Sequence, residues 1–258
     1  MLVSEIMLQQ TPVVRVLPIW HEWMDRWPTP KALAAEQPGE AVRHWGRLGY
    51  PRRALRLHAC ARAITDEHGG EVPSDHETLL SLPGIGEYTA AAVASFAYGG
   101  RHAVLDTNVR RVFARAIRGE EYPPTATSAA ERRLAESLLP ELGAPRWGGG
   151  RHGAGRPGVH GPLPRCADCP ITGLCAWRLN GKPPHAGPAR KGQTYAGTDR
   201  QCRGRLLAVL RAAHGPVPKS ALDAVWDDAA QRERALDGLI TDGLAEALDD
   251  GTYRLPHA

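Results

Sequence analysis

The stretch that decides the fold is Leu82-Pro-Gly-Ile-Gly86, which Glu87-Tyr-Thr-Ala90 follows directly. Proline stops the preceding helix, two glycines permit a tight turn, and a new helix begins at once. Such a turn directs backbone N–H groups and the positive end of a helix dipole at one point outside the protein, where a DNA phosphate fits. A plain helix–helix turn would explain these five residues equally well.

Around this turn the chain reads as helices joined by short connections, without strand-like alternation. A threonine cap with proline at the first helical position opens one helix, and a capping box, Ser74-Asp-His-Glu77, opens another. The expected helices cover residues 30–44, 74–83, 87–98, 107–118 and 129–139. We therefore predict an all-α domain over residues 1–142.

The remainder is expected to divide into four parts. Residues 143–165 contain eight glycines, four prolines and four arginines without an acidic residue, which is typical of a basic disordered linker. The further parts are a cysteine loop over 166–181, a linker over 182–198 and a winged-helix-like domain over 199–258. In the last we expect helices at 203–213, 220–226 and 229–241, and a hairpin over 245–255 that turns at Asp250-Gly251.

Composition is that of an ordinary globular protein of 258 residues, with 42% hydrophobic and 23% charged residues. No apolar run reaches the length of a membrane helix, and the start lacks the features of a signal peptide, so a cytoplasmic protein is expected. The net charge of +4 permits a polyanionic partner, and only four of the 32 basic residues are lysines. That arginine bias fits phosphate recognition or a GC-rich genome equally.

Two carboxylates stand out, although each has an ordinary explanation on its own. Asp106, in Val104-Leu-Asp-Thr-Asn-Val109, precedes an expected helix and would usually be only its N-cap. Glu5 lies in an apolar helical context, with two amides and a threonine just beyond it. An exposed glutamate is the ordinary interpretation of that position.

Taken together, Glu5, the glycine turn, Asp106 and the cysteines near residue 166 resemble the helix-hairpin-helix base-excision DNA glycosylases in order and spacing. The resemblance covers about residues 1 to 180. Within that superfamily the chain most resembles the MutY-type adenine DNA glycosylases. Their signature SEIMLQQT stands unbroken at Ser4–Thr11, and LGY followed by RA stands at Leu48–Tyr50 and Arg53-Ala54.

This resemblance implies a monofunctional enzyme that hydrolyses the N-glycosidic bond of adenine mispaired with guanine or 8-oxoguanine. Endonuclease III-type relatives carry a Schiff-base lysine two residues after the last hairpin glycine, where this chain has Tyr88. Glu5 would be the general acid and water activator, within an apolar setting made by Ile6, Met7 and Leu8. Asp106 would stabilise the sugar cation, and Tyr88 and Asn108 would support both by hydrogen bonding.

The implied partner is double-stranded DNA with a flipped adenine. The protein would bind it as a nucleoid-associated monomer, and no membrane is involved. Gln10 and Tyr50 would be wedges at the lesion, with Thr11 and Leu48 near the bases; a core aromatic is the alternative for Tyr50. The residues expected to bind DNA are Gln10, Thr11, Leu48, Tyr50 and, in the hairpin, Leu82, Gly84, Ile85 and Gly86.

Five cysteines, three of them within ten positions, favour a metal site over disulfides. The family's [4Fe–4S] cluster uses C-x6-C-x2-C-x5-C, and Cys166, Cys169 and Cys175 match its last three ligands. The first ligand falls on Val159. A cluster with this ligand missing is the first expectation, and zinc held by the three cysteines with His160 or His185 is the alternative.

The missing cysteine lies within the glycine- and arginine-rich segment. One codon choice for residues 151–164, shifted by one base, encodes Val-Met-Glu-Leu-Gly-Ala-Leu-Val-Cys-Thr-Ala-Arg-Ser-Pro, which resembles the family's pattern and has its cysteine at position 159. We hypothesise that two compensating frameshifts altered about residues 147 to 165. Resequencing tests this, because a clean read without such a second frame would refute it.

Two further departures from the family bear on activity. MutY-type enzymes usually have an additional helix before the SEIMLQQT segment, so either the true start lies upstream or the chain is truncated. Many also end in a nudix-like domain, for which residues 199–258 are too short. Two alternatives therefore stand beside the adenine glycosylase: an endonuclease III-like enzyme acting on oxidised pyrimidines, and a catalytically impaired protein that only binds DNA.

Overall fold

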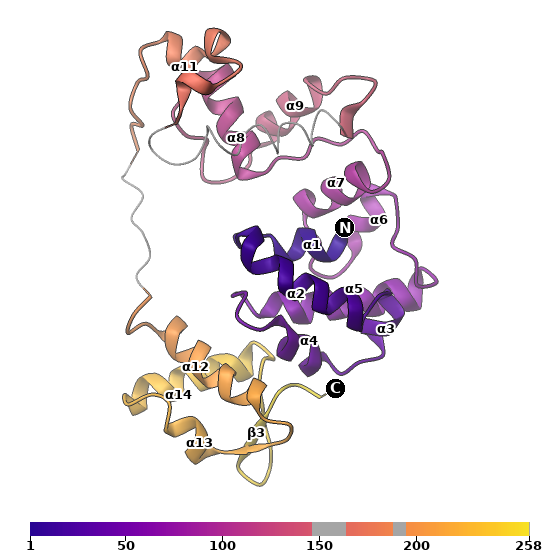
Figure 1. Ribbon diagram of the computed structural model, residues 1–258, viewed down its shortest axis with the longest axis vertical. Coiled ribbons are helices and arrows are strands. Elements are labelled where there is room, and N and C mark those ends of the chain that lie inside the picture. Colours follow the sequence, from indigo (N-terminus) through magenta and orange to yellow (C-terminus); the bar gives the residue numbers. More distant parts are fainter. Residues whose placement is uncertain (146–163, 188–194, 258) are drawn as a thin grey trace. The chain divides into compact units, whose positions relative to one another are not determined.

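The computed structural model describes residues 1–145, 164–187 and 195–257. Its contacts divide the chain into two compact units (Figure 1). The first unit comprises Met1, Ser74–Leu80 and Gly86–Arg190, and the second comprises Leu2–Pro73, Ser81–Ile85 and Lys191–Ala258.

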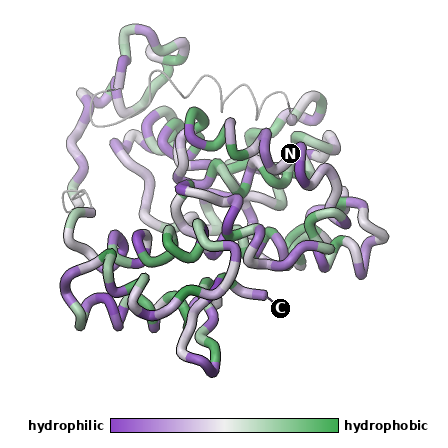
Figure 2. Tube along the Cα trace, turned by 60° about the horizontal axis from the view of Figure 1, so that its bottom comes forward, coloured by the Kyte–Doolittle hydropathy of each residue, from purple (hydrophilic) through white to green (hydrophobic). Residues whose placement is uncertain are grey.

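The amino-terminal part of the second unit is a group of five helices. They are α1 (Leu2–Met7), α2 (Val13–Arg26), α3 (Pro30–Ala34), α4 (Pro38–Trp45) and α5 (Arg52–Glu67). The long helix α5 packs against α1, α3 and α4, and large side chains such as Trp23, Trp45 and Ile64 are almost fully buried. In Figure 2 hydrophobic stretches (green) alternate with hydrophilic ones (purple) along these helices, which is expected when one face of each helix meets the core.

The prediction of one helix over residues 30–44 was wrong, because two helices occupy this stretch. The predicted cap at its start is confirmed, since the Thr29 hydroxyl accepts a hydrogen bond from the Ala32 N–H. The break falls at Pro38, which lacks an N–H and would clash with the carbonyl four residues before it in a continuous helix. Pro38 therefore begins α4 instead of continuing α3.

The carboxy-terminal part of the second unit contains three helices and a small sheet. These are α12 (Asp199–Ala212), α13 (Lys219–Asp223), α14 (Ala229–Thr241), β1 (Val217–Pro218), β2 (Glu246–Ala247) and β3 (Thr252–Arg254). The sheet is antiparallel with β3 in the centre, and Glu246 pairs with Arg254. The expected helices and hairpin are present, whereas the two-residue strand β1 had no sequence signal. The winged-helix-like assignment stays a prediction.

The turn of this hairpin is built as the sequence predicted. Gly251 has a φ of 78°, in the left-handed region that glycine adopts without strain. The carboxylate of Asp250 accepts hydrogen bonds from the Thr252 N–H and hydroxyl at 3.0 and 2.6 Å. These bonds hold the pKa of Asp250 below its usual range.

The first unit contains the helices of residues 76–137 and the short helices of the cysteine loop. They are α6 (His76–Ser81), whose last residue belongs to the second unit, α7 (Glu87–Phe96), α8 (Thr107–Phe113), the π-helical turn η1 (Ala114–Arg118), α9 (Ala129–Ser137), the 3-10 turns η2 (Cys166–Asp168) and η3 (Thr172–Leu174), and α11 (Ala176–Leu179). Asp75, not Ser74 as predicted, caps α6 by accepting from the Thr78 N–H at 2.8 Å. The pKa of Asp75 is lowered by this bond.

Within this unit α8 is fixed by a buried ion pair and an apolar cluster. Arg110 Nε and Glu131 Oε1 lie 2.8 Å apart, and the side chain of Glu131 is 2% exposed. Val109 and Phe113 pack with Ala135 on α9. The start of α8 is therefore held firmly in this unit.

Most of the 143–165 segment lies outside the described residues. The predicted disordered linker, the hypothesised frameshift and Val159 all fall on this part of the chain. In the part of the chain that the structure describes, no helix is both long and apolar enough to cross a membrane.

Candidate DNA-binding and catalytic site

The predicted site residues divide between the two units. The second unit carries Glu5, Gln10, Thr11, Leu48, Tyr50, Leu82, Gly84 and Ile85, whereas the first carries Gly86, Tyr88, Asp106, Asn108 and the three loop cysteines.

In the second unit the two predicted wedge residues are in contact. The Tyr50 hydroxyl donates a hydrogen bond to Gln10 Oε1 at 2.8 Å, although 40 residues separate them. Gln10 has a φ of 55° and Tyr50 a φ of 48°, a conformation that costs an L-residue about 1–2 kcal/mol. Tyr50 is also 54% exposed, which excludes its alternative assignment to the core. Exposed residues held in strained conformations are typical of functional sites.

The buried Arg53 on α5 joins the two loops that carry this pair. Its Nη1 donates to the carbonyls of Ile6 and Gln9 at 2.9 and 2.6 Å, and its Nη2 donates to the carbonyl of Gly49 at 3.1 Å. The guanidinium also lies 5.2 Å from the centre of the Tyr50 ring. Burial lowers the pKa of Arg53. No role was predicted for Arg53, which was noted only as part of the family signature.

Thr11 and Leu48 lie inside the protein, beneath the wedge pair. They are 7% and 4% exposed. The Thr11 hydroxyl contacts the Leu48 carbonyl at 3.4 Å and accepts a hydrogen bond from Arg53 Nη2 at 3.2 Å. Within this unit both residues connect the loop after α1 to the loop before α5.

Glu5 is half-buried on α1, five residues before Gln10, which lies beyond the end of this helix. Its neighbours Ile6 and Met7 are 3% and 0% exposed and belong to the core. Leu8 is half-buried. The helix is therefore anchored by its apolar residues, and Glu5 is placed shortly before the loop that carries Gln10.

The glycine hairpin has the local geometry that its sequence predicted. The Ile85 N–H donates to the Leu82 carbonyl at 3.1 Å, and both side chains are buried. Gly84 has a φ of 78°, and a Cβ there would lie 2.6 Å from the Cβ of Arg56, so only glycine fits. Gly86 precedes α7 and has no side chain to cap it, which leaves the helix start suited to an external anion.

In the first unit Asp106 is the N-cap of α8. Its Oδ1 accepts a hydrogen bond from the Val109 N–H at 2.6 Å. The carboxylate is half-buried, and a negative charge at a helix start is stabilised by the helix dipole. Asn108, in the first turn, accepts from Arg111 Nη1 at 3.4 Å. Asp106 thus has the ordinary capping role. Capping does not exclude the role expected from the resemblance, which is to stabilise the sugar cation.

Tyr88 is half-buried in the second position of α7 and packs on a cluster of Ala91, Ala92 and Val104. Val104 stands two residues before Asp106, so the segment leading to the α8 cap lies against the same cluster as Tyr88. The Tyr88 ring is therefore held by packing, and it stands at the position where endonuclease III-type relatives carry a lysine.

The described cysteines do not form a metal-binding group. Within residues 1–145, 164–187 and 195–257, no three His, Cys, Asp or Glu side chains are close enough to hold a metal ion. Cys175 Sγ lies 3.5 Å from the Arg115 carbonyl, and the His185 ring packs edge-on against Tyr122. Val159 and His160 lie outside these ranges. Both the cluster and the zinc site therefore stay predictions.

Comparison with known proteins decides the family. A model described as "HhH-GPD superfamily base excision DNA repair protein" matches residues 3–139. The chain belongs to this superfamily. It is 50% identical over 257 residues to an adenine DNA glycosylase of Mycobacterium tuberculosis (strain CDC 1551 / Oshkosh), covering 99% of this chain and 84% of that one.

Two further matches agree with this membership. An adenine DNA glycosylase of Mycolicibacterium smegmatis is 52% identical over 256 residues, covering 98% of this chain and 86% of that protein. A solved structure of a thermostable thymine-DNA glycosylase is 27% identical with a TM-score of 0.64, over 69% of this chain and 83% of that one. The predicted helix-hairpin-helix fold and the enzyme class, a base-excision DNA glycosylase, are confirmed.

Proposed function

We propose that the chain removes adenine from duplex DNA in which it is mispaired with guanine or 8-oxoguanine, acting as a monomer. The observation that carries the proposal is the exposed Gln10–Tyr50 pair, in which Gln10 follows Glu5 by five residues and both loops are hydrogen-bonded from beneath by Arg53. A target base must leave the stack before a carboxylate can reach it. An exposed pair of planar side chains that are hydrogen-bonded to each other suits that task.

The reaction requires a proton donor and an anion. Protonated Glu5 gives its proton to a ring nitrogen of adenine while the bond to the sugar C1′ breaks, and the electron pair leaves with the base. The sugar becomes an oxocarbenium ion, which the Asp106 carboxylate stabilises. Glu5, now ionised, takes a proton from a water molecule whose oxygen attacks C1′. Free adenine and an abasic site are the products.

The supporting residues follow from the same chemistry. Tyr88 and Asn108 would donate hydrogen bonds near the reacting sugar, and the glycine hairpin from Leu82 to Gly86 would bind a backbone phosphate. Tyr88 cannot form an imine with the sugar, so strand cleavage by β-elimination is not expected. The endonuclease III-like alternative is disfavoured for this reason and by the adenine glycosylase relatives.

The experiment that tests this proposal measures base release from four labelled duplexes. They carry adenine opposite 8-oxoguanine, guanine or thymine, and an oxidised pyrimidine opposite guanine. We expect adenine release from the first two duplexes only, without strand cleavage until alkali is added. Release of the oxidised pyrimidine would favour the endonuclease III-like alternative. Salt-dependent binding without release of any base would favour the DNA-binding alternative.

A further inference from the structure

The C-terminal module, defined as residues 195–257, is slightly acidic, whereas the rest of the chain is basic. Residues 199–258 contain eight lysines and arginines against ten acidic residues, whereas residues 1–198 contain 24 against 18. The exposed positions of α14 include Glu233 and Asp237. Because DNA-binding surfaces are strongly basic, another task for this module is indicated.

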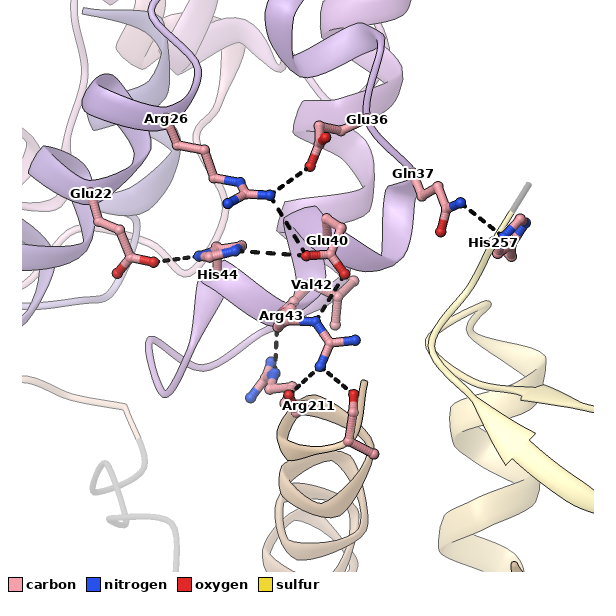
Figure 3. Close-up of polar contacts among 11 residues, drawn as sticks. Glu22, Arg26, Glu36, Gln37, Glu40, Val42, Arg43, His44, Arg211 and His257 are labelled. Atoms are coloured by element: carbon pink, nitrogen blue, oxygen red, sulfur yellow. Dashed lines mark hydrogen bonds and ion pairs between the residues drawn. The ribbon is translucent and has the colours of Figure 1, made fainter. Parts of the chain in front are cut away.

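Two arginines join the module to α4 in a reciprocal manner (Figure 3). Arg43, on α4, donates through Nη1 to the carbonyls of Arg211 and Ala213, the latter at 2.6 Å, at the end of α12. Arg211 in turn donates through Nε to the Val42 carbonyl at 2.9 Å. Each side chain thus satisfies carbonyls near the carboxyl end of the other's helix, where partial negative charge is concentrated. Burial lowers the pKa of Arg211 to about 10.

The Arg43 side chain is oriented by a neighbour on α4, and a further contact with the module is made at the start of α4. Glu40 Oε1 lies 2.9 Å from Arg43 Nε, so the Arg43 guanidinium is held toward the module. The Gly39 N–H donates to the Pro256 carbonyl at 2.8 Å, and a Cβ on Gly39 would collide with that oxygen. The module therefore holds both ends of α4.

The following helix, α5, is held by the same module. Arg52 Nη1 at its first residue lies 3.1 Å from Asp242 Oδ1, and Asp242 also pairs with Arg203 on α12. The segment between α4 and α5 is the Tyr50 loop, defined as residues 46–51. Both helices that flank the Tyr50 loop are thus fastened to the module.

We propose that the C-terminal module is a positioning element for the Tyr50 loop, and that Arg211 is a positioning residue for base removal. The module supplies no reacting group. Its contacts fix the end of α4 and the start of α5, and so they maintain the strained conformation in which Tyr50 meets Gln10. The activity part of this inference rests on the proposed function, whereas the loop conformation can be measured without it.

The first test is amide hydrogen exchange of the full-length protein with Arg211→Gln. We expect at least tenfold faster exchange of the amides of residues 46–50, while the helix α7 of the first unit exchanges as in the wild type. Arg211→Lys, which retains a donor for the Val42 carbonyl, should exchange at an intermediate rate. Lys219→Gln removes ion pairs to Asp223 and Glu233 within the module and should leave the loop unchanged. Unchanged exchange in Arg211→Gln would overturn the inference.

If Arg211→Gln does not fold, Asp242→Asn serves in its place, because it removes only the ion pairs to Arg52 and Arg203. The second test is a double-mutant cycle on single-turnover adenine release. We expect Arg211→Gln to lower the rate about 10- to 100-fold with Tyr50 present and to have little further effect on Tyr50→Ala. Equal factors in both backgrounds would indicate a merely structural role. Absence of release by the wild type would refute the proposed function while leaving the exchange test decisive.

Discussion

The Tyr50 hydroxyl donates a hydrogen bond to Gln10 Oε1 at 2.8 Å, and both residues have a left-handed backbone conformation. The two come from different loops, one after α1 and the other before α5. A single buried side chain, Arg53, hydrogen-bonds to carbonyls in both loops. The strain at the surface is therefore offset by a network of hydrogen bonds beneath it.

Gln10→Gly separates the strain from the function. Glycine adopts a φ of 55° without steric cost but loses more chain entropy on folding, so the free energy of unfolding should change by no more than about 1 kcal/mol. Adenine release should fall at least tenfold, because the amide that meets Tyr50 is lost. Lys182 has a φ of 57° outside the proposed site, so Lys182→Gly is the matched control for both measurements. Full activity in Gln10→Gly would contradict the wedge role.

Arg53→Met should destabilise the protein by about 3 kcal/mol, because it leaves the carbonyls of Ile6, Gln9 and Gly49 without their charged donor. Denaturant unfolding measures this loss. Arg62, exposed on the same helix, provides the control Arg62→Met, for which a change within about 0.5 kcal/mol is expected. Similar stabilities of the two variants would show that the hydrogen bonds of Arg53 contribute little.

Asp106→Asn tests the charge apart from the cap. Asparagine caps a helix about as well as aspartate, so α8 should stay folded and the melting temperature should change little. Single-turnover adenine release should be abolished, since the amide cannot stabilise the sugar cation. Asp228 caps α14 in the same manner, accepting from the Gln231 N–H at 2.9 Å, and Asp228→Asn should retain full activity. Retained activity in Asp106→Asn would refute its catalytic role.

Tyr88→Lys should add lyase chemistry. The new amine would stand where endonuclease III-type relatives carry theirs, and it can condense with the opened sugar of the abasic product. Borohydride should then trap a covalent protein–DNA adduct that the wild type does not form. Tyr98→Lys places an amine at an exposed position just beyond α7 and is the control. Equal trapping in both variants would argue against Tyr88 lying at the reacting sugar.

Local features were predictable from the sequence because their causes are local. The hairpin glycines, the Thr29 and Asp106 caps and the Asp250-Gly251 turn each follow from a few adjacent residues. Pro38 also carried a local signal, and the single helix predicted there overlooked it.

Long-range features were not predictable in this way. Arg43 and Arg211 are 168 residues apart, and neither is distinguishable in the sequence from the other arginines of this arginine-rich chain. Arg53 reaches carbonyls, which every residue has, so its partners leave no pattern to read. The left-handed conformations of Gln10 and Tyr50 were hidden as well, because neither residue type signals such a backbone. The family resemblance marked Gln10, Tyr50 and Arg53, whereas Arg43 and Arg211 emerge only from the contacts in the folded protein.

The most direct test of the central claim is single-turnover adenine release by Glu5→Gln from a duplex with adenine opposite 8-oxoguanine. The amide preserves the shape of the side chain but cannot deliver a proton to the base. Glu67→Gln, on the exposed end of α5, is the matched control. We predict that the wild type and Glu67→Gln release adenine, and that Glu5→Gln binds the duplex with similar affinity yet releases none. Adenine release by Glu5→Gln at the wild-type rate would contradict the account.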